Sequence, residues 1–175
     1  YSFRFHYKFL TIKQEKDYYM SEVNSVAPGF TLKNTKKEDV SLSNFKGNPV
    51  VLAFYPGAFT GVCDTEMCKL KEDMTEFNKM NATVLGISVD SPWANGAFAD
   101  KYELNFELLS DLDRSATKDY NLIFEGLGGI AGYTCANRGV IIIDSEGIIR
   151  YRWVAEPNPG VEPNYEEIIE TIKNL

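Results

Sequence analysis

The chain changes abruptly from a strand pattern to a helix pattern, and this change constrains the fold more than any other feature. The run Val50–Tyr55 is almost continuously apolar, which is typical of a strand buried on both faces of a sheet. Pro56 and Gly57 end the run, and from Gly61 or Val62 apolar residues recur at the three- and four-residue spacing of an amphipathic helix. The sequence therefore predicts a buried strand that leads through a short loop into a helix.

Strand and helix patterns continue to alternate along the rest of the chain. The expected strands cover residues 30–32, 39–42, 50–55, 83–89, 106–109, 139–143 and 148–154, and the expected helices cover 61–80, 92–102, 114–120 and 162–174. This order predicts an α/β fold of three layers, in which helices flank a mainly parallel central sheet that also contains one C-terminal antiparallel hairpin. At 175 residues, and with no linker-like stretch, we expect residues 20–175 to form a single domain.

Residues 1–19 differ from the rest of the chain. Four aromatic residues, Phe3, Phe5, Tyr7 and Phe9, alternate with polar ones, and this period of two predicts a strand with one apolar face rather than a signal peptide. Met20 resembles a natural start, so the segment is interpreted as an N-terminal extension that is either an extra strand or a non-native leader. If it folds, its aromatic face must be buried on a sheet edge or on a partner subunit.

Composition excludes several classes of function. The net charge is −7 and no basic cluster is present, which argues against nucleic acid as the main partner. No apolar run approaches the roughly 18 residues that a membrane-spanning helix needs, so we expect no membrane partner. Three cysteines are too few, and odd in number, for a disulfide-stapled scaffold, and this favours reduced thiols in the cytoplasm.

Cys63 is the first candidate for chemistry because it falls in the first turn of the predicted helix. The free N–H groups and the dipole at a helix N-terminus favour negative charge, so a thiol there can be held as a reactive thiolate. Cys68 follows five residues later, a spacing that fits neither the C-x-x-C pair of dithiol oxidoreductases nor paired zinc ligands. The two cysteines therefore need an explanation of their own.

The rest of the chain limits how Cys63 can be activated. The one histidine, His6, lies in the N-terminal extension, which argues against Cys–His proteases, histidine triads and most histidine metal sites unless that extension reaches the cleft. Arg138 stands just before a predicted strand and is the candidate cation, with a surface arginine as the alternative. The segment Gly126–Gly132 has the wrong glycine spacing for a dinucleotide site and is interpreted as a flexible active-site loop.

These residues carry a family resemblance. The motif Pro56-x-x-x-Thr60-x-x-Cys63 within FYPGAFTGVC, together with Arg138 in ANRGVIIID, resembles the peroxiredoxin family, and the likeness extends from about Val26 to the C-terminus. The resemblance implies a thioredoxin-like fold and a peroxidase that needs no metal, haem or flavin. It also implies a hydroperoxide substrate, recycling by thioredoxin or a similar dithiol donor, and a homodimer among the assemblies open to the chain.

The resemblance assigns a role to each residue of the motif. Cys63 would attack a peroxide oxygen and become a sulfenic acid, and Thr60 would hydrogen-bond both the thiolate and the peroxide. Pro56 would shield the site from water, and Arg138 would stabilise the thiolate and the leaving oxygen. Glu66 would orient Arg138, although an acidic residue near a helix N-terminus also has a simple electrostatic explanation.

The resemblance also implies a partner for the oxidised sulfur. Cys68 is similar to the resolving cysteine of the peroxiredoxin Q, or bacterioferritin-comigratory, branch, with a small buried residue as the alternative. Five residues of ideal helix give a rise of about 7.5 Å and a turn of about 140°, so a Cys63–Cys68 disulfide requires the helix to unwind. The segment around Arg138 instead resembles the alkyl hydroperoxide reductase E branch, which lacks this cysteine. Cys135 matches neither branch and is interpreted as a structural thiol rather than a second resolver.

Other functions remain open at this point. The chain could act as a redox sensor or holdase through reversible oxidation of Cys63, or as a one-cysteine peroxidase resolved by an external thiol. A thioredoxin-fold oxidoreductase acting on protein disulfides is disfavoured because C-x-x-C is absent.

Overall fold

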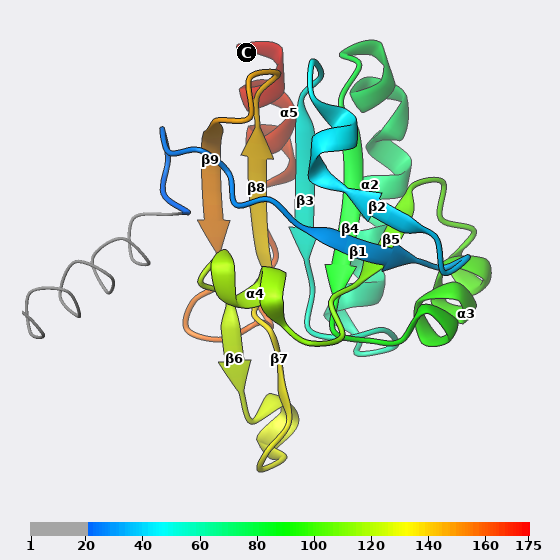
Figure 1. Ribbon diagram of the computed structural model, residues 1–175. Coiled ribbons are helices and arrows are strands. Elements are labelled where there is room, and N and C mark those ends of the chain that lie inside the picture. Colours follow the sequence, from blue (N-terminus) through cyan, green and yellow to red (C-terminus); the bar gives the residue numbers. More distant parts are fainter. Residues whose placement is uncertain (1–20) are drawn as a thin grey trace, which may run out of the picture.

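Residues 21–175 form three layers, a central sheet with helices on both faces (Figure 1). The structure is a computed structural model that describes these residues. The strand predicted within residues 1–19 lies outside the described residues. The predicted boundary between residues 19 and 20 also lies outside them. The α/β three-layer architecture predicted from the strand and helix patterns is confirmed.

The elements follow the predicted order, except that two short strands at residues 123–125 and 134–136 were not predicted. The strands are β1 (Thr31–Asn34), β2 (Asp39–Ser41), β3 (Val50–Phe54), β4 (Thr83–Ser88), β5 (Glu107–Ser110), β6 (Ile123–Glu125), β7 (Thr134–Ala136), β8 (Gly139–Ile143) and β9 (Ile149–Val154). The helices are α2 (Val62–Lys79), α3 (Pro92–Tyr102), α4 (Ser115–Asp119) and α5 (Tyr165–Lys173), with 3₁₀ turns η1 (Leu42–Phe45) and η2 (Leu127–Gly129). The last helix begins three residues later than predicted because the Asn164 side chain caps it by accepting from two backbone N–H groups.

The main sheet has seven strands in the order β2-β1-β5-β4-β3-β8-β9. Strands β3, β4 and β5 are parallel, and the remaining neighbours pair antiparallel. The predicted C-terminal hairpin is present as β8–β9, and β1 and β2 form a second hairpin. Only two of the six neighbouring pairs of this sheet within residues 21–175 are parallel, so the sheet is mixed and the prediction of a mainly parallel sheet is wrong, because both hairpins and the β1–β5 and β3–β8 pairs add antiparallel neighbours. Because β3 is an interior strand, between β4 and β8, its carboxyl end has structure on both sides.

Alternating residues of β3 belong to two different cores. Leu52 and Phe54 face the core that includes α4, whereas Val51 and Ala53 face the core that includes α2 and α5. In Figure 1 α2 and α5 lie behind the sheet and α4 lies in front of it. The strand is apolar at every position because both of its faces are buried, as the unbroken apolar run predicted.

The glycine-rich segment differs from its prediction as a loop at the active site. It contains η2 and forms the tip of a hairpin made by β6 and β7, which extends away from the body of the domain (Figure 1). Positive φ angles at Gly126, Gly128 and Gly129 explain the glycines, since L side chains rarely adopt this conformation. The glycines therefore build a turn, and Tyr133, which follows them, brings its hydroxyl close to Gly57 in the loop after β3.

None of the helices in residues 21–175 is both long enough and apolar enough to cross a membrane.

Gly86 on β4 provides a test of how tightly the core is packed. A Cβ atom at this position would overlap the buried side chain of Leu108, so we expect Gly86→Ala to destabilise the protein by about 1–3 kcal/mol. Gly96→Ala is the matched control, because Gly96 lies inside α3 and its Cβ would meet ordinary space. This control should raise stability by about 0.5–1 kcal/mol through helix propensity. Urea unfolding of the two variants measures both effects, and equal stabilities would contradict the packing argument.

Candidate active site

Cys63 lies where the sequence predicted it, in the first turn of α2. Strand β3 ends at Phe54, and the loop that follows brings the chain to Gly61, the N-cap of the helix, with a φ of 70°. The Cys63 side chain is fully buried and belongs to the core between the sheet and α2. A fully buried sulfur at a helix N-terminus depends on nearby donors if it is to carry charge.

Two side chains supply such donors to the Cys63 sulfur. The Thr60 hydroxyl lies 2.9 Å from Sγ and can donate to it, and Arg138 Nη2 donates to Sγ at 3.1 Å. Thr60 Oγ1 is also 2.7 Å from the carbonyl oxygen of Gly57, and its single proton can serve one of these acceptors at a time. The structure thus brings Cys63, Thr60 and Arg138 together.

Arg138 is held by three acceptors, two of them on α2 and one in the C-terminal loop. Its Nε donates to the carbonyl oxygen of Pro159 at 2.9 Å, its Nη1 donates to the Glu66 carboxylate, and its Nη2 donates to Cys63. The residue is only 1% exposed, so it is not the surface arginine that was its alternative explanation. A buried guanidinium requires such compensation because an unpaired charge inside a protein is very costly.

The position of Arg138 follows from the register of the sheet. Strands β3 and β8 pair antiparallel with Phe54 opposite Gly139, so the residue before Gly139 lies beside the end of β3. Cys63 follows shortly after that same end. Sheet pairing therefore brings together two residues that are 75 positions apart in the sequence.

Glu66 lies on α2 one turn after Cys63 and is completely buried. Burial raises the pKa of its carboxyl to about 7, although the Arg138 guanidinium acts in the opposite direction. One carboxylate oxygen contacts Arg138, and Oε1 has no hydrogen-bond partner within the described part of the chain. The carboxylate thus faces the guanidinium, as expected for a residue that orients it.

Pro56 is buried at the start of the loop, immediately after β3 and Tyr55. Sequence reasoning missed two groups that fix this loop and its surroundings. Asp90, after β4, accepts a 2.7 Å hydrogen bond from the backbone N–H of Ala58, and the carbonyl oxygen of Pro159 anchors Arg138. Asp90 stands in the segment GISVDSP, but a backbone-to-carboxylate bond between two separate loops leaves no pattern in the sequence.

The other two cysteines occupy different environments, and all three thiols are free. Cys68 is half-buried on α2, more than one turn beyond Cys63. Cys135 is buried on β7, where burial raises the pKa of its thiol to about 11, with a smaller contribution from the nearby charge of Cys63. The Cys135 thiol is therefore protonated at neutral pH.

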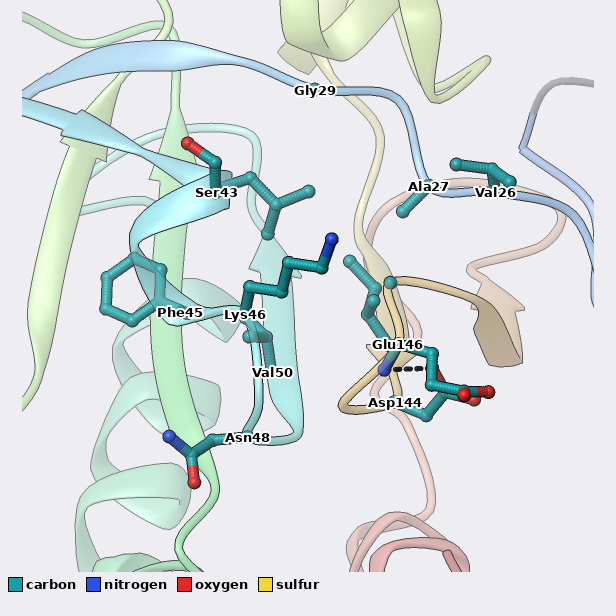
Figure 2. Close-up of a pocket in the computed structure, with 13 residues that line it drawn as sticks. Val26, Ala27, Gly29, Ser43, Phe45, Lys46, Asn48, Val50, Asp144 and Glu146 are labelled. Atoms are coloured by element: carbon teal, nitrogen blue, oxygen red, sulfur yellow. Dashed lines mark hydrogen bonds between the residues drawn. The ribbon is translucent and has the colours of Figure 1, made fainter.

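The described residues contain no cluster of three or more His, Cys, Asp or Glu side chains that could hold a metal ion. A hollow does exist elsewhere, between the start of β3 and the turn that joins β8 to β9 (Figure 2). Its lining includes Leu42, Val50 and Ile143, and it lies at the end of the sheet opposite to Cys63. This hollow is therefore separate from the residues gathered around the Cys63 sulfur.

The arrangement around Cys63 is suited to nucleophilic attack on a bond whose leaving atom gains negative charge. A sulfur that accepts from a hydroxyl and a guanidinium is stabilised as an anion, since charge-assisted hydrogen bonds are stronger than neutral ones. The same two donors can then hydrogen-bond an oxygen that becomes negative during the reaction.

Comparison with known proteins gives a consistent result. The AhpC/TSA family matches residues 23–152. Among curated proteins, the chain is 36% identical over 151 residues to a chloroplastic peroxiredoxin Q of Triticum aestivum, covering 86% of this chain and 66% of that protein. It is also 36% identical over 155 residues to a peroxiredoxin of Thermoplasma volcanium, covering 85% and 72%. The chain spans about two thirds of the length of the first of these relatives.

Solved structures show the same fold. The reduced 2-Cys peroxiredoxin of Plasmodium vivax is similar with a TM-score of 0.76 and 30% identity, covering 86% of this chain and 80% of that one. A cysteine-to-serine mutant of PrxQ from Xylella fastidiosa is similar with a TM-score of 0.76 and 25% identity, covering 87% and 96%. The thioredoxin-like fold expected from the motif around Cys63 is thus confirmed.

The raised pKa of Glu66 generates a test of the buried ion pair. An acid whose pKa is raised in the folded state is stabilising while protonated, and this contribution is lost as pH rises from about 4.5 to about 7. The free energy of unfolding of the native protein should therefore fall relative to that of Glu66→Gln across this range, by at most about 1.4 kcal/mol per pH unit. Urea unfolding of both proteins at several pH values measures the difference. A difference that instead grows with pH would mean that attraction to Arg138 outweighs burial.

Proposed function

This chain belongs to the AhpC/TSA family, on its peroxiredoxin Q branch, and we propose that it is a thiol-dependent peroxidase in which Cys63 is the peroxidatic residue. The single observation that supports this best is the contact of the Cys63 sulfur with both Thr60 and Arg138. The substrates are hydrogen peroxide and small organic hydroperoxides, and electrons return from a thiol reductant.

In the first step the Cys63 thiolate attacks the terminal oxygen of the hydroperoxide. An S–O bond forms and the O–O bond breaks, so the sulfur is oxidised to a sulfenic acid while the leaving oxygen takes up a proton as water or an alcohol. Arg138 stabilises the negative charge on the sulfur before attack and on the leaving oxygen during it. Thr60 hydrogen-bonds the sulfur and the bound peroxide, and buried Pro56 limits the access of water.

Glu66 acts through Arg138 rather than on the peroxide. Its carboxylate and the carbonyl oxygen of Pro159 hold two of the guanidinium nitrogens, which leaves Nη2 directed at the Cys63 sulfur. Because the planar guanidinium has a fixed fork of donors, fixing two of its nitrogens also fixes the third.

In the second step Cys68 attacks the sulfenic acid of Cys63, which forms an intramolecular disulfide and releases water. Thioredoxin or a similar dithiol protein then reduces this disulfide by thiol–disulfide exchange. Five residues of helix place the Cα atoms of Cys63 and Cys68 farther apart than a disulfide allows, so the start of α2 unwinds during this step. A homodimer and a cytoplasmic location remain predictions from the sequence.

Replacement of Cys63 tests the central assignment. We expect Cys63→Ser to lose peroxide consumption by several orders of magnitude, because the oxygen nucleophile is far less acidic and less nucleophilic than the thiolate. Cys135→Ser is the matched control and should retain activity, since its thiol is buried and protonated. Peroxide consumption in a coupled assay with thioredoxin measures both. Retained activity in Cys63→Ser would overturn the assignment, and client binding triggered by peroxide without turnover would favour a redox sensor.

Replacement of Cys68 separates oxidation from recycling. We expect Cys68→Ser to form the sulfenic acid at the native rate but to turn over poorly with thioredoxin, because the internal disulfide cannot form. Mass spectrometry after one equivalent of peroxide should show a Cys63–Cys68 disulfide in the native protein and a sulfenic acid in the variant. Amide hydrogen exchange at the start of α2 should be faster in the oxidised native protein than in the reduced one. A persistent sulfenic acid in the native protein would favour a one-cysteine peroxidase with an external thiol.

A further inference from the structure

Tyr102, the last residue of α3, contacts the side of α2 that carries Cys68. Its hydroxyl donates a 2.5 Å hydrogen bond to Asp64 Oδ2, and its carbonyl oxygen accepts one of 2.9 Å from Lys71 Nζ. Asp64, Cys68 and Lys71 are spaced by four and three residues, so they lie along one face of the helix. The hydrogen bond to Asp64, and to a smaller extent the nearby charge of Cys68, raise the pKa of the Tyr102 phenol. Tyr102 therefore contacts α2 at Asp64, before Cys68 in the sequence, and at Lys71, after it.

The same end of α3 also holds the loop before Cys63. Phe59 has a φ of 63°, a conformation that is costly for a side chain of this size, and it is 48% exposed. Its ring packs edge-on against Phe98 at 5.2 Å, and Lys101 Nζ lies 5.3 Å from its centre. Phe98 and Lys101 contact the Tyr102 ring in the same way, at 5.2 Å each. One aromatic and cationic cluster thus joins α3 to the loop that leads into the helix.

The Asp64 carboxylate makes few other contacts. Within the described residues its Oδ1 is buried without a hydrogen-bond partner, and the bond from Tyr102 is the one that its side chain receives. Asp64 follows Cys63 directly and belongs to the turn that must open before Cys63 can reach Cys68. Opening this turn therefore breaks the Tyr102–Asp64 bond, whereas the reduced helix keeps it.

We propose that Tyr102 is a positioning residue that holds the first turn of α2 closed and thereby sets how fast Cys68 captures the sulfenic acid of Cys63. The inference rests on the proposed function. Capture by Cys68 competes with a second hydroperoxide molecule, which oxidises the sulfenic acid to a sulfinic acid and leaves as water or an alcohol. A tight Tyr102–Asp64 bond favours the closed, peroxide-reactive site, slows disulfide formation and makes the protein more sensitive to inactivation by excess peroxide.

Tyr102→Phe is the direct test, because it removes the hydroxyl and keeps the aromatic ring in its cluster. Amide exchange at residues 62–68 of the reduced variant should be faster by about tenfold, the factor expected for the loss of a hydrogen bond to a charged group. The disulfide should also form faster, and the peroxide concentration that half-inactivates the protein should rise. Exchange is followed by mass spectrometry, and the ratio of disulfide to sulfinic acid is measured across a peroxide titration.

Tyr151→Phe is the matched control. It removes a hydroxyl that donates to the Glu167 carboxylate at 3.2 Å, between β9 and α5, and should leave exchange at residues 62–68 unchanged. A second control uses Asp64→Ala, in which the bond is already lost, so adding Tyr102→Phe should have no further effect on exchange.

The outcomes separate this inference from the proposed function on which it rests. Unchanged exchange at residues 62–68 in reduced Tyr102→Phe overturns the role of Tyr102, whatever the resolving thiol proves to be. Faster exchange without faster disulfide formation also overturns it, since opening of the helix would then not limit the reaction. Absence of a Cys63–Cys68 disulfide in the oxidised native protein contradicts the resolving role of Cys68, while the exchange measurement still decides whether Tyr102 holds the helix.

Discussion

The buried guanidinium of Arg138 is the interaction on which the arrangement of the site depends. Two of its acceptors, Glu66 and Cys63, lie on α2, and the third is the carbonyl oxygen of Pro159 in the C-terminal loop. One side chain thus ties the start of β8 to two other segments. Such a charge is tolerated inside the protein because each of its nitrogens has an acceptor. The fold must supply acceptors for the buried guanidinium. The guanidinium in turn fixes the positions of the Glu66 carboxylate and the Cys63 sulfur.

This dependence explains why the site is built at the end of β3. The sheet pairs β3 with β8 on one side and with β4 on the other, and residues that follow or precede these strands meet at the same edge. Arg138 arrives from β8, Asp90 from β4, and Cys63 from the helix after β3. Strands are rigid and their register is fixed by pairing, so the site is positioned by the most stable part of the domain even though its residues lie in loops and at helix ends.

The sequence was sufficient for the parts of this picture that depend on local pattern. The unbroken apolar run of β3 predicted a strand covered on both faces, and helix periodicity placed Cys63 in a first turn. Two contacts between distant segments could not be predicted from the sequence. The bond from Ala58 to Asp90 and the carbonyl of Pro159 under Arg138 involve backbone groups, which every residue has, so no residue type marks them. The glycine-rich segment was assigned to the site because flexibility was inferred from composition, whereas positive φ angles in a hairpin turn account for its glycines.

The three cysteines show that environment, rather than residue type, divides the chemistry. Burial dominates at Cys135, so its thiol has a pKa of about 11 and keeps its proton at neutral pH. Cys63 is equally buried, but the Thr60 hydroxyl and the Arg138 guanidinium both lie within hydrogen-bond distance of its sulfur, and Cys135 has no such donors among the described residues. Cys68 is half-buried on a helix face bridged by Tyr102, where it is kept apart from Cys63 as long as the helix is intact. The helix that places Cys63 beside Arg138 therefore also separates it from Cys68, the thiol proposed to complete the reaction, and the contacts of its first turn, including the Tyr102–Asp64 bond, hold this separation.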